Sequence, residues 1–166
     1  MTLSRPRQIW LLIALGAAAL AVGSLLLTAW LDLHPCHLCI FQRLLWLALA
    51  GFATLAFVWP HAIFGRLASL IVIVTGLGVA GYQSWLELQP PGTASCVGGQ
   101  PGLIERLVEW LGEHAPTLFL ATGFCDEPEL SILGLTLANA SLIGFTTFFV
   151  LALWAWSFQP NSRNHP

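Results

Sequence analysis

The sequence reads LLWLALAGFATLAFVWPHAIFG from residue 44 to residue 65, a run of 22 residues without a charged side chain. Three further uncharged runs cover residues 8–31, 67–86 and 130–162. An α-helix needs roughly 20 apolar residues to cross the hydrocarbon core of a bilayer, which is about 30 Å thick. All four runs meet this length, so the sequence predicts four transmembrane helices.

The composition agrees with a membrane protein and excludes an ordinary soluble domain. Hydrophobic residues make up 57% of the 166 residues and charged residues only 8%, whereas soluble domains have about 25% charged residues. The net charge is −2 and all six basic residues are arginine, so no basic surface exists for a nucleic acid backbone. We expect an all-α membrane protein with one domain over residues 1–166 and no nucleic acid partner.

We expect the four helices at about 9–31, 40–59, 64–86 and 131–157, with loops at about 32–39 and 87–130. The first helix has an alternative interpretation, because Arg5 and Arg7 precede an apolar run as they do in a secretory signal peptide. The apolar region of a signal peptide is only about 7 to 15 residues long. Here the run continues from Ile9 to Leu31, which favours a transmembrane helix.

The arginines predict how the bundle is oriented in the membrane. Arg5, Arg7, Arg66 and Arg163 all fall on one side of four successive spans, and the cytoplasmic flanks of membrane helices collect Lys and Arg. We therefore expect both termini in the cytoplasm and both loops on the outer side, which is the periplasm in a bacterial envelope.

The long loop is expected to carry a short amphipathic helix. Its apolar residues recur at helical spacing and its acidic residues fall on the opposite face: Leu103, Ile104, Leu107, Val108 and Leu111, against Glu105, Glu109 and Glu113. Such a helix can lie flat in the membrane interface or pack onto the end of the bundle, and the sequence leaves both arrangements open.

All four cysteines are predicted on the outer side, Cys36 and Cys39 in the first loop and Cys96 and Cys125 in the second. Disulfides form and persist in the periplasm, which is oxidising. An even number of cysteines in two separate loops suggests two pairs, Cys36 with Cys39 and Cys96 with Cys125.

The surroundings of the first pair favour redox chemistry. Pro35 suits the first turn of a helix, so the second helix is expected to begin near residues 33–36, with Cys36 and Cys39 on one face of that turn. The N–H groups and dipole of a helix N-terminus favour a thiolate, which is the form that exchanges disulfides. Arg43 follows one turn deeper, where a charge indicates a functional site. Its side chain can also extend back to the interface, and the two interpretations are compatible.

The stretch Pro35-Cys36-His37-Leu38-Cys39-Ile40-Phe41-Gln42-Arg43 resembles the Pro-Cys-x-Leu-Cys-x-x-Gln-Arg motif of the disulfide bond formation protein B (DsbB) family. The segments Gly123-Phe124-Cys125 and Leu133-Gly134-Leu135 are also similar to that family, and the likeness covers nearly the whole chain. Two positions depart from the family: a histidine common before the second loop is absent from residues 81–85, and a tryptophan common after the last loop cysteine is replaced around Leu130.

The resemblance implies an inner-membrane protein-dithiol:quinone oxidoreductase that re-oxidises a periplasmic thioredoxin-fold partner similar to DsbA. It would support disulfide formation in secreted proteins, with ubiquinone or menaquinone as the cofactor. The family's roles imply that the partner attacks Cys96 of the Cys96–Cys125 disulfide, and that electrons then pass to the Cys36–Cys39 pair. Cys39 would deliver them to a quinone beside Arg43, and no resident metal is implied.

Three alternative functions are compatible with parts of this sequence. His34, Cys36, His37 and Cys39 suit a zinc or copper site, although the helices hold no second cluster to receive the ion and the loop cysteines would have no role. A non-enzymatic scaffold stapled by two disulfides does not account for a CxxC at a helix start beside Arg43. Vitamin K epoxide reductase relatives share a four-helix bundle, a CxxC and a quinone, but they lack the Gln-Arg signature and carry the motif late in the chain.

Overall fold

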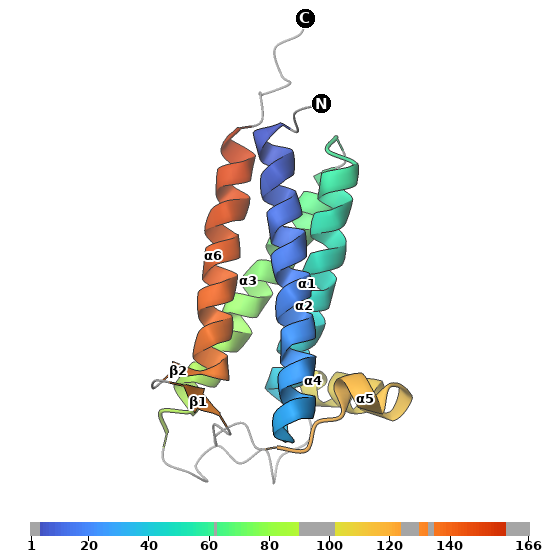
Figure 1. The fold of residues 1–166 in the computed structure, drawn as a ribbon, viewed down its shortest axis with the longest axis vertical. Helices are drawn as coiled ribbons and strands as arrows, with labels where there is room; N and C mark the ends of the chain where they lie inside the picture. The colour runs from blue at the N-terminus through green and yellow to red at the C-terminus, as the bar shows by residue number, and fades with distance from the viewer. Residues whose placement is uncertain (1–3, 62, 90–101, 124–129, 133–134, 159–166) are drawn as a thin grey trace, which may run out of the picture.

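The computed structural model describes residues 4–61, 63–89, 102–123, 130–132 and 135–158. Four long helices run along one another (Figure 1): α1 (Arg5–Leu31), α2 (His37–Val58), α3 (Ile63–Leu86) and α6 (Leu137–Ser157). By length and composition, each of them is able to cross a membrane. The predicted all-α, multi-pass membrane fold is confirmed.

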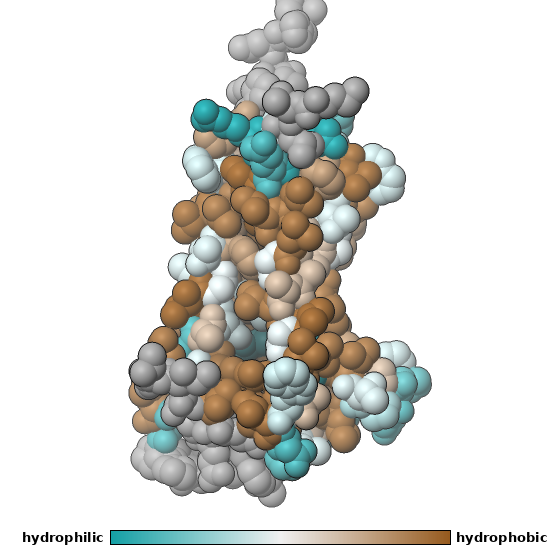
Figure 2. All heavy atoms as spheres, in the orientation of Figure 1, coloured by the Kyte–Doolittle hydropathy of each residue, from teal (hydrophilic) through white to brown (hydrophobic). Residues whose placement is uncertain are grey.

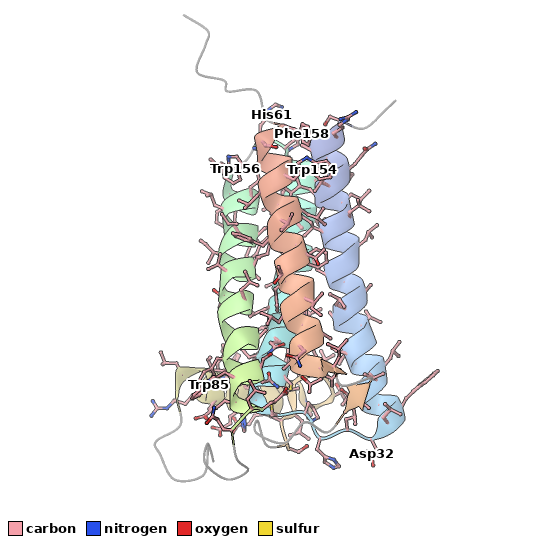
Figure 3. All side chains as sticks on the ribbon, turned by 90° about the vertical axis from the view of Figure 1, so that its left-hand side faces the viewer. Asp32, His61, Trp85, Trp154, Trp156 and Phe158 are labelled. Carbon is pink, nitrogen blue, oxygen red and sulfur yellow. The ribbon has the colours of Figure 1, made fainter. Side chains whose placement is uncertain are left out.

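The two ends of the bundle differ in what they carry. The start of α1, the turn between α2 and α3 and the end of α6 share one end (Figure 1), where Figure 3 shows His61, Trp154 and Trp156. Asp32 and Trp85 mark the other end (Figure 3), which also carries the short helices α4 (Leu103–His114) and α5 (Pro116–Phe119). The end that faces the cytoplasm stays a prediction.

Small residues allow close helix contacts in the core. Alanines at Ala17 of α1, Ala53 of α2, Ala80 of α3 and Ala155 of α6 are fully buried, and small side chains let membrane helices approach closely. The aromatic centre of the core is a stack of Trp46 from α2 on Phe145 from α6, with ring centroids 3.6 Å apart. The exposed side chains along the helices are mainly apolar (Figure 2), as a lipid-facing surface requires.

Two helix boundaries differ by four residues or more from the sequence prediction. α1 begins at Arg5 instead of about residue 9, and Pro6 lies in its first turn, where the fixed φ of proline suits a helix. The last helix begins at Leu137 instead of about residue 131, because a short antiparallel pair of strands precedes it, β1 (Ser131–Ile132) and β2 (Leu135–Thr136). The Thr136 hydroxyl then accepts a hydrogen bond from the backbone N–H of Asn139, which caps the helix.

The expected amphipathic helix is present as α4 and packs against the bundle. Val108 is fully buried in a cluster with Ile40 of α2 and Phe119 of α5. Leu103 and Trp110 remain exposed, and α4 and α5 project to the side of the bundle at the end that carries Cys36 (Figure 1). Packing on the bundle is shown, whereas contact with the membrane interface stays a prediction.

Replacing Gly76 by alanine is expected to destabilise the bundle, because its added β-carbon would meet the Phe145 ring. That ring is held by its stack on Trp46, and overpacking of this kind costs about 1–3 kcal/mol. Gly78 is the matched control, since nothing lies within 4 Å of an added β-carbon there. Thermal unfolding in detergent should show a lower Tm for Gly76→Ala and an unchanged or slightly higher Tm for Gly78→Ala.

Candidate redox site

The two thiols of the CxxC motif lie at the N-terminus of α2. Cys36 is the N-cap residue, and its sulfur accepts a hydrogen bond from the backbone N–H of Cys39. The helix thus begins after Pro35, and the expectation that Pro35 forms part of the first turn is wrong. The two Sγ atoms are 3.1 Å apart, longer than the disulfide bond of about 2.05 Å, so these atoms are in contact without being bonded to each other.

Two glutamines from different helices form a hydrogen-bonded chain that ends at the thiols. The Gln83 side chain of α3 donates from Nε2 to Cys39 Sγ at 3.1 Å and to Cys36 Sγ at 3.6 Å. Its Oε1 accepts a hydrogen bond from Nε2 of Gln42 at 2.7 Å, which turns the N–H groups of Gln83 toward the sulfurs. Both glutamines are only 3% exposed. A buried donor at this distance stabilises negative charge on sulfur.

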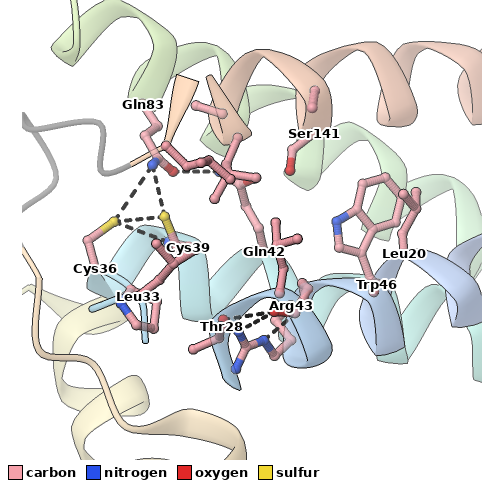
Figure 4. Close-up of a pocket in the computed structure, with 18 of the residues that line it drawn as sticks. Leu20, Thr28, Leu33, Cys36, Cys39, Gln42, Arg43, Trp46, Gln83 and Ser141 are labelled. Carbon is pink, nitrogen blue, oxygen red and sulfur yellow. Dashed lines mark hydrogen bonds between the residues drawn. The ribbon is translucent and has the colours of Figure 1, made fainter. Parts of the chain in front are cut away.

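Gln83 is the site residue that sequence reasoning missed. It lies within residues 81–85, where the chain departs from the family's common histidine, and the structure puts its amide against both thiols (Figure 4). Its signal in the sequence is a polar side chain in an uncharged, apolar run. A glutamine in such a run can form a hydrogen bond to a neighbouring helix of the bundle.

Arg43 is buried within the protein, with only 5% of it exposed, and an extension of its side chain back to the membrane interface stays a prediction. Its Nε donates to Ser24 Oγ at 3.1 Å, and its Nη2 donates to Thr28 Oγ1 at 2.8 Å and to the Ser24 carbonyl at 3.3 Å. Its Nη1 donates to the Leu118 carbonyl of α5 at 2.8 Å. The guanidinium therefore ties α2 to α1 and to the segment that follows α4.

One cavity of about 280 Å³ contacts the thiols and Arg43 together. Its walls come from α1, α2, α3 and α6, and they are mostly apolar. Cys36 and Cys39 lie at one end of the cavity, and Trp46 and Leu20 lie at the other (Figure 4). Figure 2 shows the face between α1 and α6 hollowed toward the thiol end, with hydrophilic side chains inside an apolar surface.

Cys96 and Cys125 lie outside the described residues. The chain shortly before Cys125 is described, however, and it runs beside the CxxC motif. The backbone N–H groups of Thr122 and Gly123 donate to the Pro35 carbonyl at 3.0 and 3.3 Å. A β-carbon on Gly123 would meet the backbone carbonyl of His34, so this close approach requires glycine.

Two histidines, His34 and His37, lie near the thiols. His37 Nε2 faces Glu109 Oε1 of α4 at 4.0 Å, and His34 lines the cavity. Within the part of the chain that the structure describes, no three His, Cys, Asp or Glu side chains are grouped to hold a metal ion.

The comparisons with known proteins agree with this arrangement. The family model for disulfide bond formation protein DsbB matches residues 6–155. A relative from Dechloromonas aromatica (strain RCB), named Disulfide bond formation protein B, is 39% identical over 143 residues, which are 85% of this chain and 86% of the relative. A protein of the same name from Neisseria meningitidis serogroup A is 37% identical over 158 residues, which are 91% of this chain and 94% of the relative. With a thiol pair at a helix N-terminus and a match over nearly its whole length, the chain belongs to the DsbB family, membrane oxidoreductases of disulfide bond formation.

Proposed function

We propose that the protein is a protein-dithiol:quinone oxidoreductase of the bacterial inner membrane. It re-oxidises a DsbA-like thioredoxin-fold dithiol in the periplasm and passes the electrons to a membrane quinone, ubiquinone or menaquinone. The observation that carries this proposal is the single cavity that contacts Cys36, Cys39 and Arg43 and reaches into the apolar part of the bundle. The end of the bundle that carries α4 and α5 then faces the periplasm, and both termini face the cytoplasm.

The lining of the cavity supports a quinone head group as its ligand. Ligand pockets are mostly apolar, with a few polar groups at defined positions, and this one adds the Gln42 and Gln83 amides to the two thiols. Its position between α1 and α6 leaves room for an isoprenoid tail to extend toward lipid. A bound quinone supplies a two-electron acceptor next to the thiols.

The path between the two cysteine pairs is supported by the backbone contacts before Cys125. Disulfide exchange requires a thiolate to reach a disulfide sulfur. Hydrogen bonds from Thr122 and Gly123 to Pro35 hold the chain that leads to Cys125 beside Cys36. The relay then runs from the partner to Cys96 and Cys125, from Cys125 to Cys36, and from Cys39 toward the acceptor.

The electrons balance over this relay. The partner's two thiols become a disulfide while the Cys96–Cys125 disulfide is reduced, and the Cys96 and Cys125 thiols are re-oxidised as the Cys36–Cys39 disulfide is reduced. Closing the Cys36–Cys39 bond again releases two electrons and two protons, which are those that a quinone needs to become a hydroquinone. Arg43 places a permanent positive charge in the cavity wall, where negative charge develops during this transfer.

The direct test is anaerobic reduction of a short-chain ubiquinone or menaquinone analogue by the purified protein, started with a reduced thioredoxin-fold dithiol. Wild-type protein should reduce the analogue. The rate of reduction by Cys39→Ala should fall to background, because the electrons of the reduced dithiol then have no path to the acceptor. Thr146→Ala, an exposed position on α6, should match the wild type. If Cys39→Ala keeps its activity, the assignment of Cys39 is wrong.

Arg43→Gln is expected to raise the KM for the quinone analogue about tenfold, because it removes a charge that binds the acceptor. Thr28→Val is the matched control, since it removes one hydrogen bond of Arg43 at 2.8 Å and keeps the charge. A rise in KM for both variants alike would indicate that the contact between α1 and α2 matters and the charge does not.

Gly123→Ala is expected to slow turnover driven by the protein dithiol about tenfold, because its β-carbon would push the chain before Cys125 away from His34. Turnover driven by dithiothreitol, which is small enough to reduce the Cys36–Cys39 pair directly, should stay unchanged. Gly102→Ala is the control glycine, where the nearest atom to an added β-carbon is 3.8 Å away. Equal loss with both reductants would contradict the proposed path between the pairs.

A further inference from the structure

A carboxyl group that the relay does not use lies beside the cavity. Glu87 follows the last residue of α3, four positions after Gln83. Its backbone N–H donates to the Gln83 carbonyl at 3.1 Å, so both side chains leave the same face of the chain one turn apart. The Thr136 hydroxyl donates to Glu87 Oε2 at 2.6 Å. Thr136 is also the N-cap of α6, so this contact joins the ends of α3 and α6 next to the thiols.

Glu87 borders two hollows at once. It lines the cavity that contains Cys36, Cys39 and Gln83. It also lines a second, more open hollow with Trp85, Leu88 and Asn139. The exposed side chains of Trp85 and Leu88 place this second hollow at the surface of the bundle end. The carboxyl group thus lies between the redox cavity and the outside.

We propose that Glu87 is the proton-transfer residue for reduction of the quinone by the Cys36–Cys39 pair. This inference rests on the proposed function and adds a catalytic residue to it. Its carboxylic acid gives a proton to the acceptor's oxygen, and the carboxylate that remains takes up a proton that the thiols lose. The outer hollow lets the carboxyl group exchange protons with water between turnovers.

The step balances without an additional reactant. Two S–H bonds break, one S–S bond forms, and two electrons and two protons pass to the acceptor. Glu87 begins and ends each turnover as the acid, because the proton that it gives is replaced by one from the thiols.

The surroundings of Glu87 favour its carboxylic acid form over the carboxylate. Burial raises the pKa of the Glu87 carboxyl, and the hydrogen bond from Thr136 partly opposes this shift. The other titratable or charged groups on the redox cavity are His34, Cys36, Cys39 and Arg43. On the α6 side, the described residues 135–158 include no titratable side chain, and Tyr82 of α3 is exposed.

A general acid must be protonated, so the rate should fall as the pH rises through the pKa of Glu87. Quinone reduction by purified full-length protein with a reduced thioredoxin-fold dithiol is therefore measured across pH. Glu87→Gln should lower kcat about 100-fold, the low end of what a positioned acid contributes, and should lose the alkaline fall. Glu113→Gln, an exposed carboxylate on α4, is the matched control and should behave as wild type.

Substitutions of Thr136 distinguish proton transfer by Glu87 from a purely structural role of Glu87, because only proton transfer makes the pH profile depend on the pKa of Glu87. Thr136→Val removes the hydrogen bond that lowers the pKa of Glu87, so the alkaline fall should move to higher pH. Thr136→Ser keeps the hydroxyl and should leave the profile in place. Infrared spectra without quinone should show a protonated carboxyl band, absent in Glu87→Gln, whose titration midpoint moves in the same direction in Thr136→Val.

The outcomes separate the two levels of the proposal. If wild-type protein leaves the quinone oxidised at every pH, the proposed function fails and the role of Glu87 fails with it. If wild-type protein turns over and Glu87→Gln keeps both its rate and its alkaline fall, only the role of Glu87 is overturned. The role of Glu87 would also be overturned if the titration midpoint of the carboxyl band were the same in Thr136→Val as in the wild type.

Discussion

A charged guanidinium inside an apolar bundle must find its hydrogen-bond acceptors within the protein, and the thiol end of this structure is arranged around that requirement. Arg43 obtains acceptors from Ser24 and Thr28 of α1 and from the Leu118 carbonyl of α5. Lipid would offer none, and an unsatisfied charge there costs several kcal/mol. The same bonds therefore fix α1 against α2 and hold the long loop close to the thiols.

The close packing of the rest of the bundle explains where the cavity can exist. Toward the far end of the cavity, Trp46 stacks on Phe145, and Gly76 leaves the space that the Phe145 ring occupies. Toward the thiol end, α1 and α6 are separated enough to leave a hollow of about 280 Å³. A packed core beside an open, mostly apolar pocket gives a lipid-soluble molecule one defined place to meet the thiols.

The thiols themselves lie where two environments meet. Their sulfurs are at the N-terminus of α2, where the helix provides N–H groups and a favourable dipole, and the amide of Gln83 adds a neutral donor from α3. On one side the apolar cavity begins, and on the other side the backbone that leads to Cys125 is bonded to Pro35. A thiol pair in this position has access to a protein disulfide from outside and to a hydrophobic acceptor from inside.

The sequence by itself determined the four long apolar helices, the amphipathic helix and the position of the CxxC pair at a helix start, because these features depend on local composition and short spacings. It also indicated Arg43, since a charge stands out in an apolar segment. It did not determine that α6 starts only at Leu137, because an apolar run has no periodicity that separates a strand from a helix. Only the tertiary structure brought Gln83 to the sulfurs and Glu87 to Thr136. These contacts join residues 44 to 49 positions apart, and the packing of separate helices decides which polar side chains meet.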